Sequence, residues 1–154
     1  MLSRHWFQAR ASERGNALIE AALLLPLLVC LLLGAADFGR LFYKAMAVTY
    51  AARAGVQYGA QSVSKSSDIS GMQGASSGAA SDITGFSPGT PTKMCTCWNG
   101  SAESAPTVCS TLVCGSTVRI YVTVTGTARF TTLVSWPGIP HTVTITRAAR
   151  MRAQ

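Results

Sequence analysis

The sequence is poor in the side chains that most enzymes use for chemistry. Two histidines, His5 and His141, and six acidic residues occur in 154 residues. The acids beyond residue 36 are Asp37, Asp68, Asp82 and Glu103. No two of them have the spacing of a catalytic pair, and the chain has neither a glycine-rich phosphate loop nor a nucleophile elbow. We therefore expect a protein that is not an enzyme and that holds no cofactor and no metal ion.

Acidic residues are also scarce relative to basic ones, and the formal net charge is +7. Five arginines lie in the last third of the chain, namely Arg119, Arg129, Arg147, Arg150 and Arg152. They are spread along strand-like segments, without the clustered patch and interleaved aromatic residues of a nucleic-acid-binding groove. We expect no nucleic-acid partner, and a surface that faces solvent or anions.

One long stretch has no charged residue. It runs from Ala21 to Ala36, and with residues 17–20 it reaches roughly the ~20 residues that span a bilayer. A hydrophobic content of 48% and a mean hydropathy of +0.28 fit one small domain plus a membrane segment. Arg4, Arg10 and Arg14 precede the stretch, and positive flanks stay in the cytoplasm. The sequence thus predicts a cytoplasmic N-terminus and an exported C-terminal domain.

Two other interpretations of this apolar stretch are possible besides a retained membrane helix: a lipoprotein signal and an ordinary signal peptide. A lipoprotein needs a small residue before its cysteine, and Val29 precedes Cys30. An ordinary signal peptide cleaved after Ala36 fits the small residues at 34–36 and leaves an exported, disulfide-stabilised envelope or binding protein. Against that alternative, Glu20 stands at the start of the apolar core, where a plain signal peptide gains nothing from a carboxylate.

Helical patterning also continues past Ala36. Apolar residues recur at helical spacing: Phe38, Leu41, Phe42, Ala45, Val48, Ala52 and Val56. The opposite side carries Arg40, Lys44, Tyr50, Arg53 and Gln57. The pattern predicts one helix from about Asn16 to about Ala60, its first half in lipid and its second half amphipathic. Pro26 within it is either a simple kink or a point of local melting. Small residues that allow close helix packing are Gly34, Ala35, Ala36 and Gly39.

Gly15 followed by Glu20 resembles the processing site of type IV prepilins. The longer pattern GNALIEAALLLPLLVCLLLGAADFGR, followed by YAARAGVQYGA, resembles the TadE-like proteins, the pseudopilins of the Tad (Flp-type) tight-adherence pilus system. The sequence departs from many relatives at Ala21, where they carry an aromatic residue. The resemblance implies cleavage between Gly15 and Asn16 by a prepilin peptidase, and a minor or accessory role in pilus assembly.

The same resemblance implies an environment and partners. We expect a single-pass protein of the bacterial inner membrane with a periplasmic C-terminal domain. Its expected partners are the prepilin peptidase, other pilins and pseudopilins, the Tad inner-membrane assembly proteins and the lipid bilayer. Cleavage would free the α-amine of Asn16, which would meet the Glu20 carboxylate of a neighbouring subunit in poorly solvated surroundings. The alternative is that Glu20 lies near the headgroups and reaches water.

Beyond the helix, residues 61–92 are rich in serine and glycine. Asp68 has the character of a helix cap, and a short helix would place Ile69, Met72, Ser76, Ala79 and Ile83 on one face. A segment with two prolines, Phe86–Pro91, then interrupts regular structure.

The cysteines outside the membrane segment lie close together. Cys95 and Cys97 belong to a strand-like segment, Met94–Trp98, that ends in the turn dipeptide Asn99–Gly100. With Cys109 and Cys114 they are expected to form disulfides on the oxidising side of the membrane, joining the first pair to the second in an order that the sequence leaves open. A zinc site is the alternative, although the spacings differ from the common C-x2-C pattern. Cys30 is expected to remain a free thiol.

Three further segments have strand character: Thr117–Thr125 ended by Gly126, a second strand within Ala128–Val134, and Thr142–Thr146 after a turn at Trp136–Pro140. We expect an α+β fold in which a small antiparallel sheet covers the amphipathic half of the long helix. The expected regions are a leader (1–15), a transmembrane helix (16–36), its amphipathic continuation (37–60), the Ser/Gly-rich segment (61–92) and a β-rich extracytoplasmic domain (93–154).

Overall fold

A computed structural model describes residues 10–154, with side chains from residue 15 onward. The chain forms two compact units, one ending at Gly39 and the other running Arg40–Gln154. Each is described by itself. The first nine residues, which include Arg4 and His5 of the expected leader, lie outside the described part of the chain.

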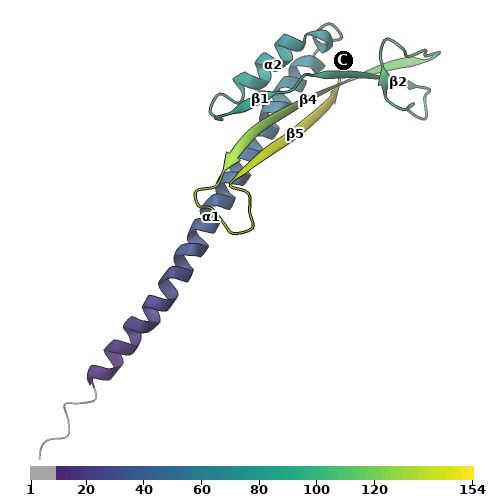
Figure 1. The fold of residues 1–154 in the computed structure, drawn as a ribbon. Helices are drawn as coiled ribbons and strands as arrows, with labels where there is room; N and C mark the ends of the chain where they lie inside the picture. The colour runs from purple at the N-terminus through teal and green to yellow at the C-terminus, as the bar shows by residue number, and fades with distance from the viewer. Residues whose placement is uncertain (1–9) are drawn as a thin grey trace, which may run out of the picture. The chain divides into compact units, whose positions relative to one another are not determined.

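The long N-terminal helix predicted from the sequence is confirmed. Helix α1 spans Arg10–Ala60, 51 residues, and Pro26 lies inside it (Figure 1). It ends at the predicted residue but starts earlier, because residues 10–15 of the expected leader already belong to the helix. One helix among the described residues is long and apolar enough to cross a membrane, and it is this one. The expected leader boundary therefore has no break in backbone structure.

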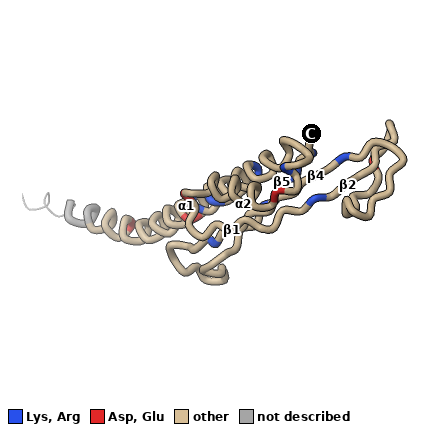
Figure 2. Tube along the Cα trace, turned by 90° about the horizontal axis from the view of Figure 1, so that it is seen from above, with Lys and Arg blue, Asp and Glu red and all other residues tan. Residues whose placement is uncertain are grey.

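The C-terminal unit contains an antiparallel sheet, which confirms the α+β class. Its strands are β1 (Phe86–Pro88), β2 (Thr92–Trp98), β3 (Thr107–Val108), β4 (Thr117–Thr131) and β5 (Thr142–Arg152). The central strand is β4 (Figure 1), because β2 and β1 pair successively with one of its edges and β5 with the other. The five C-terminal arginines lie on β4 and β5 (Figure 2).

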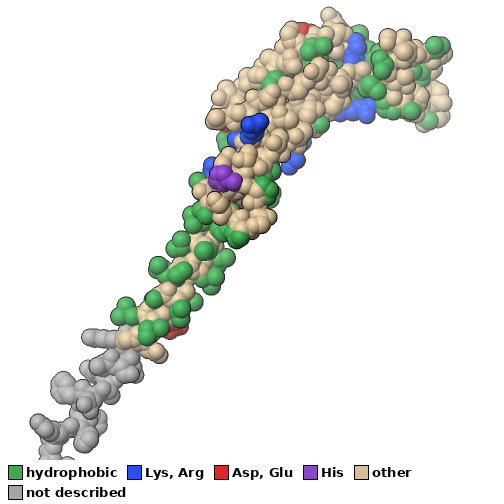
Figure 3. Space-filling model, in the orientation of Figure 1, with side chains coloured by type: hydrophobic (Ala, Val, Ile, Leu, Met, Phe, Trp, Pro, Cys, Tyr) green, Lys and Arg blue, Asp and Glu red, His purple; other side chains and the backbone are tan. Residues whose placement is uncertain are grey.

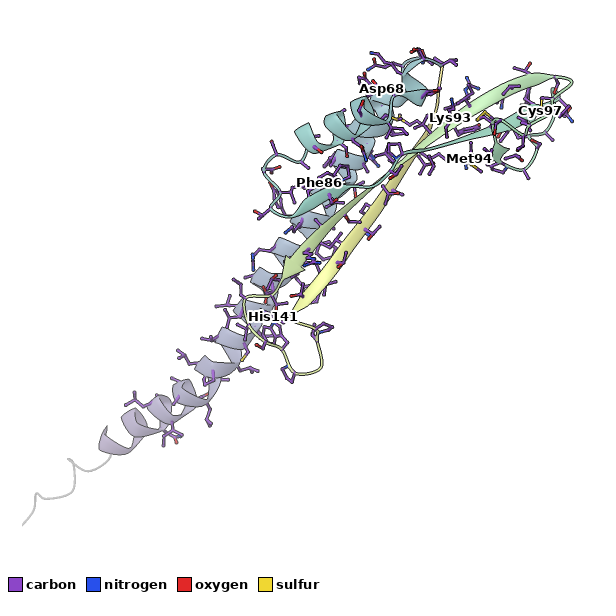
Figure 4. The ribbon with its side chains drawn as sticks, turned by 45° about the horizontal axis from the view of Figure 1, so that its top comes forward. Asp68, Phe86, Lys93, Met94, Cys97 and His141 are labelled. Carbon is purple, nitrogen blue, oxygen red and sulfur yellow. A yellow bond between two sulfur atoms is a disulfide. The ribbon has the colours of Figure 1, made fainter. Side chains whose placement is uncertain are left out.

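The prediction that Gly126 ends a strand is wrong, and so is the separate strand within Ala128–Val134. Strand β4 runs without interruption through Gly126. A Cβ at this position would lie 2.8 Å from a ring carbon of Phe86 and 3.3 Å from Val48. Phe86 lies on the neighbouring strand (Figure 4). Gly126 therefore allows close packing in mid-strand, which the sequence does not distinguish from a strand terminator.

The core forms where the C-terminal half of α1 meets the sheet and a second helix, α2 (Ile69–Gly78). One buried cluster contains Val48, Ala51, Ala80, Ile83 and Ala128, and another contains Val56, Met72, Val122 and Val124. Alternate residues of β4 from Val122 to Phe130 are buried, as a strand with one covered face requires. The buried part of the expected face begins only at Val122, because Val118 is 48% exposed.

The expected apolar face of α1 is correct from Val48 onward and wrong for Phe38 and Phe42. These two rings are exposed, at 61% and 64%. The face that the sheet covers consists of small residues instead, with Ala51, Ala52 and Gly55 buried beside Val48. Small side chains let the helix approach its neighbours closely, so the large aromatic residues occupy the uncovered side.

The short helix expected after Asp68 is confirmed as α2, which follows a single 3₁₀ turn at Lys65–Ser67. Met72 and Ser76 are buried as expected, but Ile69 is 47% exposed. Ala79 is exposed and Ala80 is buried in its place, because α2 ends at Gly78 and the helical register is lost.

Candidate functional site: the N-terminal helix and its supports

The expected processing residues lie within α1. Gly15, Asn16 and Glu20 are all exposed, and the bond between Gly15 and Asn16 is part of the helix. Asn16 and Glu20 are four residues apart, so they share one face about 6 Å apart along the axis. Glu20 thus lies about one helical turn beyond the expected cleavage bond. Of the residues that precede Gly15, only 10–14 are described, as backbone.

The apolar side chains that follow Glu20 are exposed. From Leu18 to Leu32, the large aliphatic residues expose between 45% and 74% of their surface. Figure 3 shows hydrophobic side chains along the whole described N-terminal part of α1, with tan backbone visible between them. So large an apolar surface is not stable in water and marks contact with lipid or with other apolar helices. This surface therefore suggests that the first unit is a membrane anchor.

Two residues of this stretch have further expected roles. Pro26 is exposed and lies inside the helix, where it cannot donate a backbone hydrogen bond. The helix assignment continues across it. Cys30, four residues later, is an exposed free thiol, as expected.

The small residues expected to pack against other helices stay largely uncovered. Gly34 is half-buried, whereas Ala35, Ala36 and Gly39 are exposed. A Cβ built on Gly39 would meet no atom within 4 Å. The helix surface here has space for a partner, and its use in helix packing stays a prediction.

A comparison with protein-family models identifies this segment. Residues 15–57 match the family described as TadE-like protein. The suspected resemblance is thereby confirmed. The TadE-like segment, residues 15–57, begins at the glycine of the expected cleavage site and contains both Glu20 and Pro26. It ends three residues before the end of α1. Searches of curated proteins and of solved structures find no match to the chain.

Two residues near the end of α1 were missed by the sequence analysis, Gly55 within the TadE-like segment and Gly59 just beyond it. A Cβ on Gly55 would lie 2.8 Å from the backbone oxygen of Met72 and 3.1 Å from Val124. One on Gly59 would lie within 2.5 Å of the Met72 sulfur. These glycines allow α1 to contact α2 and β4. The signal that could have revealed them is their spacing of four residues, in line with the buried residues Ala51 and Ala52.

Helix α1 is also tied to α2 by hydrogen bonds. Asp68 caps α2 by accepting from the Gly71 amide and the Ser70 hydroxyl, each at 2.9 Å, and it accepts from the Tyr58 hydroxyl at 2.8 Å. These bonds hold the pKa of Asp68 below its usual value, the Gly71 amide contributing most. The bond to Asp68 raises the pKa of Tyr58. Deeper in the same interface, the Ser76 hydroxyl donates to the Ala51 carbonyl at 2.9 Å.

The four clustered cysteines form two disulfides at the far end of β2. Cys95 pairs with Cys109, and Cys97 with Cys114, which settles the order that the sequence left open. The zinc alternative is excluded for this arrangement because a disulfide leaves no thiolate to bind the metal. Among the described residues, no group of three or more His, Cys, Asp or Glu side chains gathers at one point.

A polar cluster braces the disulfide-bonded loops. Glu103 accepts from Arg119 at 2.7 Å and from the Tyr121 hydroxyl at 2.8 Å. The Arg119 guanidinium stacks on the Trp98 ring, 4.0 Å from its centre. The bond from Arg119 contributes most to lowering the pKa of Glu103. The cluster joins the β2 end of the sheet to the loop that follows Asn99–Gly100. The chain reverses here, but through the four residues 99–102 between Trp98 and Glu103 rather than through a two-residue turn, and Gly100 has a positive φ of 98°.

Proposed function

We propose that this chain is a pseudopilin-like accessory component of a tight-adherence pilus system. The observation that carries the proposal is the TadE-like match, which starts at Gly15 and contains Glu20 five residues later in an apolar helix with exposed side chains. In this role the chain is a peptidase substrate and an assembly part rather than a catalyst. The C-terminal unit is the exported domain that the helix carries.

The membrane placement follows from the physical character of α1. Its apolar surface anchors the chain in the bacterial inner membrane, with the basic leader in the cytoplasm and the C-terminal unit in the periplasm. Disulfides form in that oxidising compartment, which agrees with the two bridges of the sheet domain. The small residues Gly34, Ala35, Ala36 and Gly39 let neighbouring helices approach closely.

In the proposed maturation, a prepilin peptidase cuts between Gly15 and Asn16. An acidic side chain in a membrane helix is unfavourable, by about 2.5–3.5 kcal/mol at the helix centre and less toward its ends, so Glu20 at the start of the apolar core gains from a compensating partner. The new α-amine of Asn16 on an adjacent pilin or pseudopilin supplies one. The attraction between the two charges is stronger in the membrane than in water because the dielectric constant is lower.

Mass spectrometry of the protein purified from its own bacterium tests the maturation. The proposal expects a mature N-terminus at Asn16, and an uncut precursor when Gly15→Trp fills the position before the bond. Asn16→Ser is the matched control and is expected to be cut. A mature N-terminus at Asp37 would instead establish the exported alternative with a conventional signal peptide.

The role of Glu20 is tested by electron microscopy of pili in strains that carry single variants. Glu20→Leu is expected to be processed normally and to reduce piliation, whereas Glu20→Asp keeps the charge and retains more of it. Normal piliation with Glu20→Leu would contradict the pairing of Glu20 with an amine.

A further inference from the structure

The loop that joins β4 to β5, residues 132–141, is apolar at its tip and exposed. Leu133, Val134 and Ile139 expose 55%, 37% and 54% of their surface, and Trp136 is half-buried. The loop is closed at its base, where the Thr132 amide donates to the His141 carbonyl at 3.0 Å. Figure 4 labels His141 at this point. Such a group of apolar side chains at a loop tip calls for an explanation.

The tip has a defined conformation. The Ile139 amide donates to the Trp136 carbonyl at 3.2 Å, and Gly138 has a positive φ of 80°. Pro137 followed by Gly138 is the residue pair favoured at the centre of a type II turn. Trp136 and Ile139 are therefore held at the two ends of one tight turn. A preorganised tip loses little conformational entropy when it enters an apolar phase.

Packing within the C-terminal unit shows where this loop lies along α1. Strand β4 runs antiparallel to the helix, because Val122 faces Gly59, Val124 faces Gly55, and Gly126 faces Val48. Four residues further along β4, the centre of the Phe130 ring lies 5.5 Å from the guanidinium carbon of Arg40, at the N-terminal end of the unit. The loop follows β4 directly in the chain, at this end of the sheet.

A second contact fixes the same end of the hairpin. The Lys44 ammonium donates to the Arg129 carbonyl at 2.5 Å. Arg40 is four residues beyond Ala36, the last residue of the uncharged stretch, and four residues span at most about 14 Å even when extended. Through Arg40, the base of the loop is thus connected to the end of the proposed membrane span by only four residues of chain.

The charges around the loop suit a membrane surface. Lys44 and Arg129 lie at the base of the loop, and no acidic residue follows Glu103 in the sequence. The acidic residue beside this turn of α1 is Asp82, which accepts a hydrogen bond from the Tyr43 hydroxyl at 3.0 Å. Aromatic residues and basic residues with long side chains are favoured where the headgroups meet the acyl chains. Phe42 and Tyr43, 64% and 61% exposed, add two rings to the adjacent turn of α1.

We propose that loop 132–141 inserts its apolar tip into the interfacial region of the membrane that α1 crosses. The lipid surface is the occupant, with anionic headgroups meeting Lys44 and Arg129. This second attachment holds the sheet domain against the bilayer. The inference rests on the proposed membrane anchoring by α1, and its test is designed so that the two fail separately.

The test uses tryptophan fluorescence of the full chain reconstituted in phosphatidylcholine vesicles, with and without phosphatidylglycerol. Trp6→Phe with Trp98→Phe leaves Trp136 as the one tryptophan, and the matched control, Trp6→Phe with Trp136→Phe, leaves Trp98. Lipids brominated near the headgroup are expected to quench Trp136, more strongly with phosphatidylglycerol, while aqueous acrylamide quenches it poorly. Trp98 is expected to show the opposite behaviour.

Two further variants make the result decisive. Leu133→Asp combined with Ile139→Asp should abolish quenching of Trp136 by brominated lipid. Val113→Asp, at a 95% exposed position in a disulfide-bonded loop, should leave it unchanged. Leu28→Trp in a chain without the native tryptophans reports on the span through lipids brominated near the chain ends. Quenching of that tryptophan without quenching of Trp136 overturns the loop proposal alone, whereas loss of both overturns the anchoring with it.

Discussion

Tyr58 near the end of α1 donates its hydroxyl proton to Asp68, the residue that caps α2, across 2.8 Å. One carboxylate thus satisfies the first turn of a short helix and joins that helix to the long one. The arrangement needs a glycine at position 71, because a Cβ there would lie within 2.5 Å of both the Asp68 carboxylate and the Tyr58 ring. Tyr58, Asp68 and Gly71 together fix how α1 meets α2. None of the three indicates this contact when it is considered alone in the sequence.

Asp68→Ala is expected to lower the melting temperature of the C-terminal unit more than Tyr58→Phe does. The first change removes the cap and all three hydrogen bonds, and the second removes one. Asp82→Ala is the control, since Asp82 also accepts from a tyrosine, Tyr43, at 3.0 Å but lies beyond the end of α2. Thermal unfolding of the full chain in detergent, monitored by tryptophan fluorescence, gives the melting temperature of each variant. Equal effects of Asp68→Ala and Asp82→Ala would contradict the capping role.

Because of the hydrogen bond between Tyr58 and Asp68, the free energy of unfolding of the C-terminal unit is expected to fall at both acid and alkaline pH. The pKa of Asp68 is lowered in the fold, so its contribution is present above the ordinary value of 3.8 and is lost as the pH falls through the folded pKa. The pKa of Tyr58 is raised, so its contribution is present below 10.0 and is lost as the pH rises through the folded pKa. Urea unfolding midpoints across pH should show both losses. Asp68→Asn should flatten the acid side, and Tyr58→Phe the alkaline side.

Gly55→Ala is expected to destabilise the C-terminal unit by about 1–3 kcal/mol, because its Cβ would meet a backbone oxygen, which cannot move aside. Gly59→Ala should cost less, since the atom it meets first is the sulfur of the flexible Met72 side chain. Gly74→Ala, in the middle of α2 with no atom within 4 Å, is the control. It should stabilise by roughly 0.5–1 kcal/mol through helix propensity. Denaturant unfolding of the full chain gives all three values, and a neutral Gly55→Ala would refute the close packing.

The disulfide order predicts which thiol each cysteine variant releases. Cys95→Ser should leave Cys109 open to alkylation while Cys114 stays protected. Cys97→Ser should release Cys114 and leave Cys109 protected. Peptide mass spectrometry after labelling without reductant identifies the modified residue, with the free thiol of Cys30 present in every sample as a reference. Release of the opposite partner in either variant would reverse the pairing.

The sequence by itself determined the long helix, the membrane character of its first half and the likeness to TadE-like proteins. These features are local, because an uncharged run, a lone carboxylate and a helical period can be identified from the sequence without any knowledge of tertiary contacts. The helix end at Ala60, the cap at Asp68 and a chain reversal after Trp98 were predictable for the same reason. The roles of Gly15 and Glu20 also come from this local pattern and stay predictions.

Only the tertiary structure decided which residues of the second half face the core. Phe38 and Phe42 satisfy the apolar period but lie outside, because the covered side of α1 is selected by the close approach of α2 and β4 to Gly55 and Gly59. Gly126 continues a strand for a related reason, since a neighbouring ring occupies the space of its side chain. Cysteine pairing likewise follows from strand register and loop paths. Such contacts join residues distant in the chain, and a periodic pattern along the chain carries no information about them.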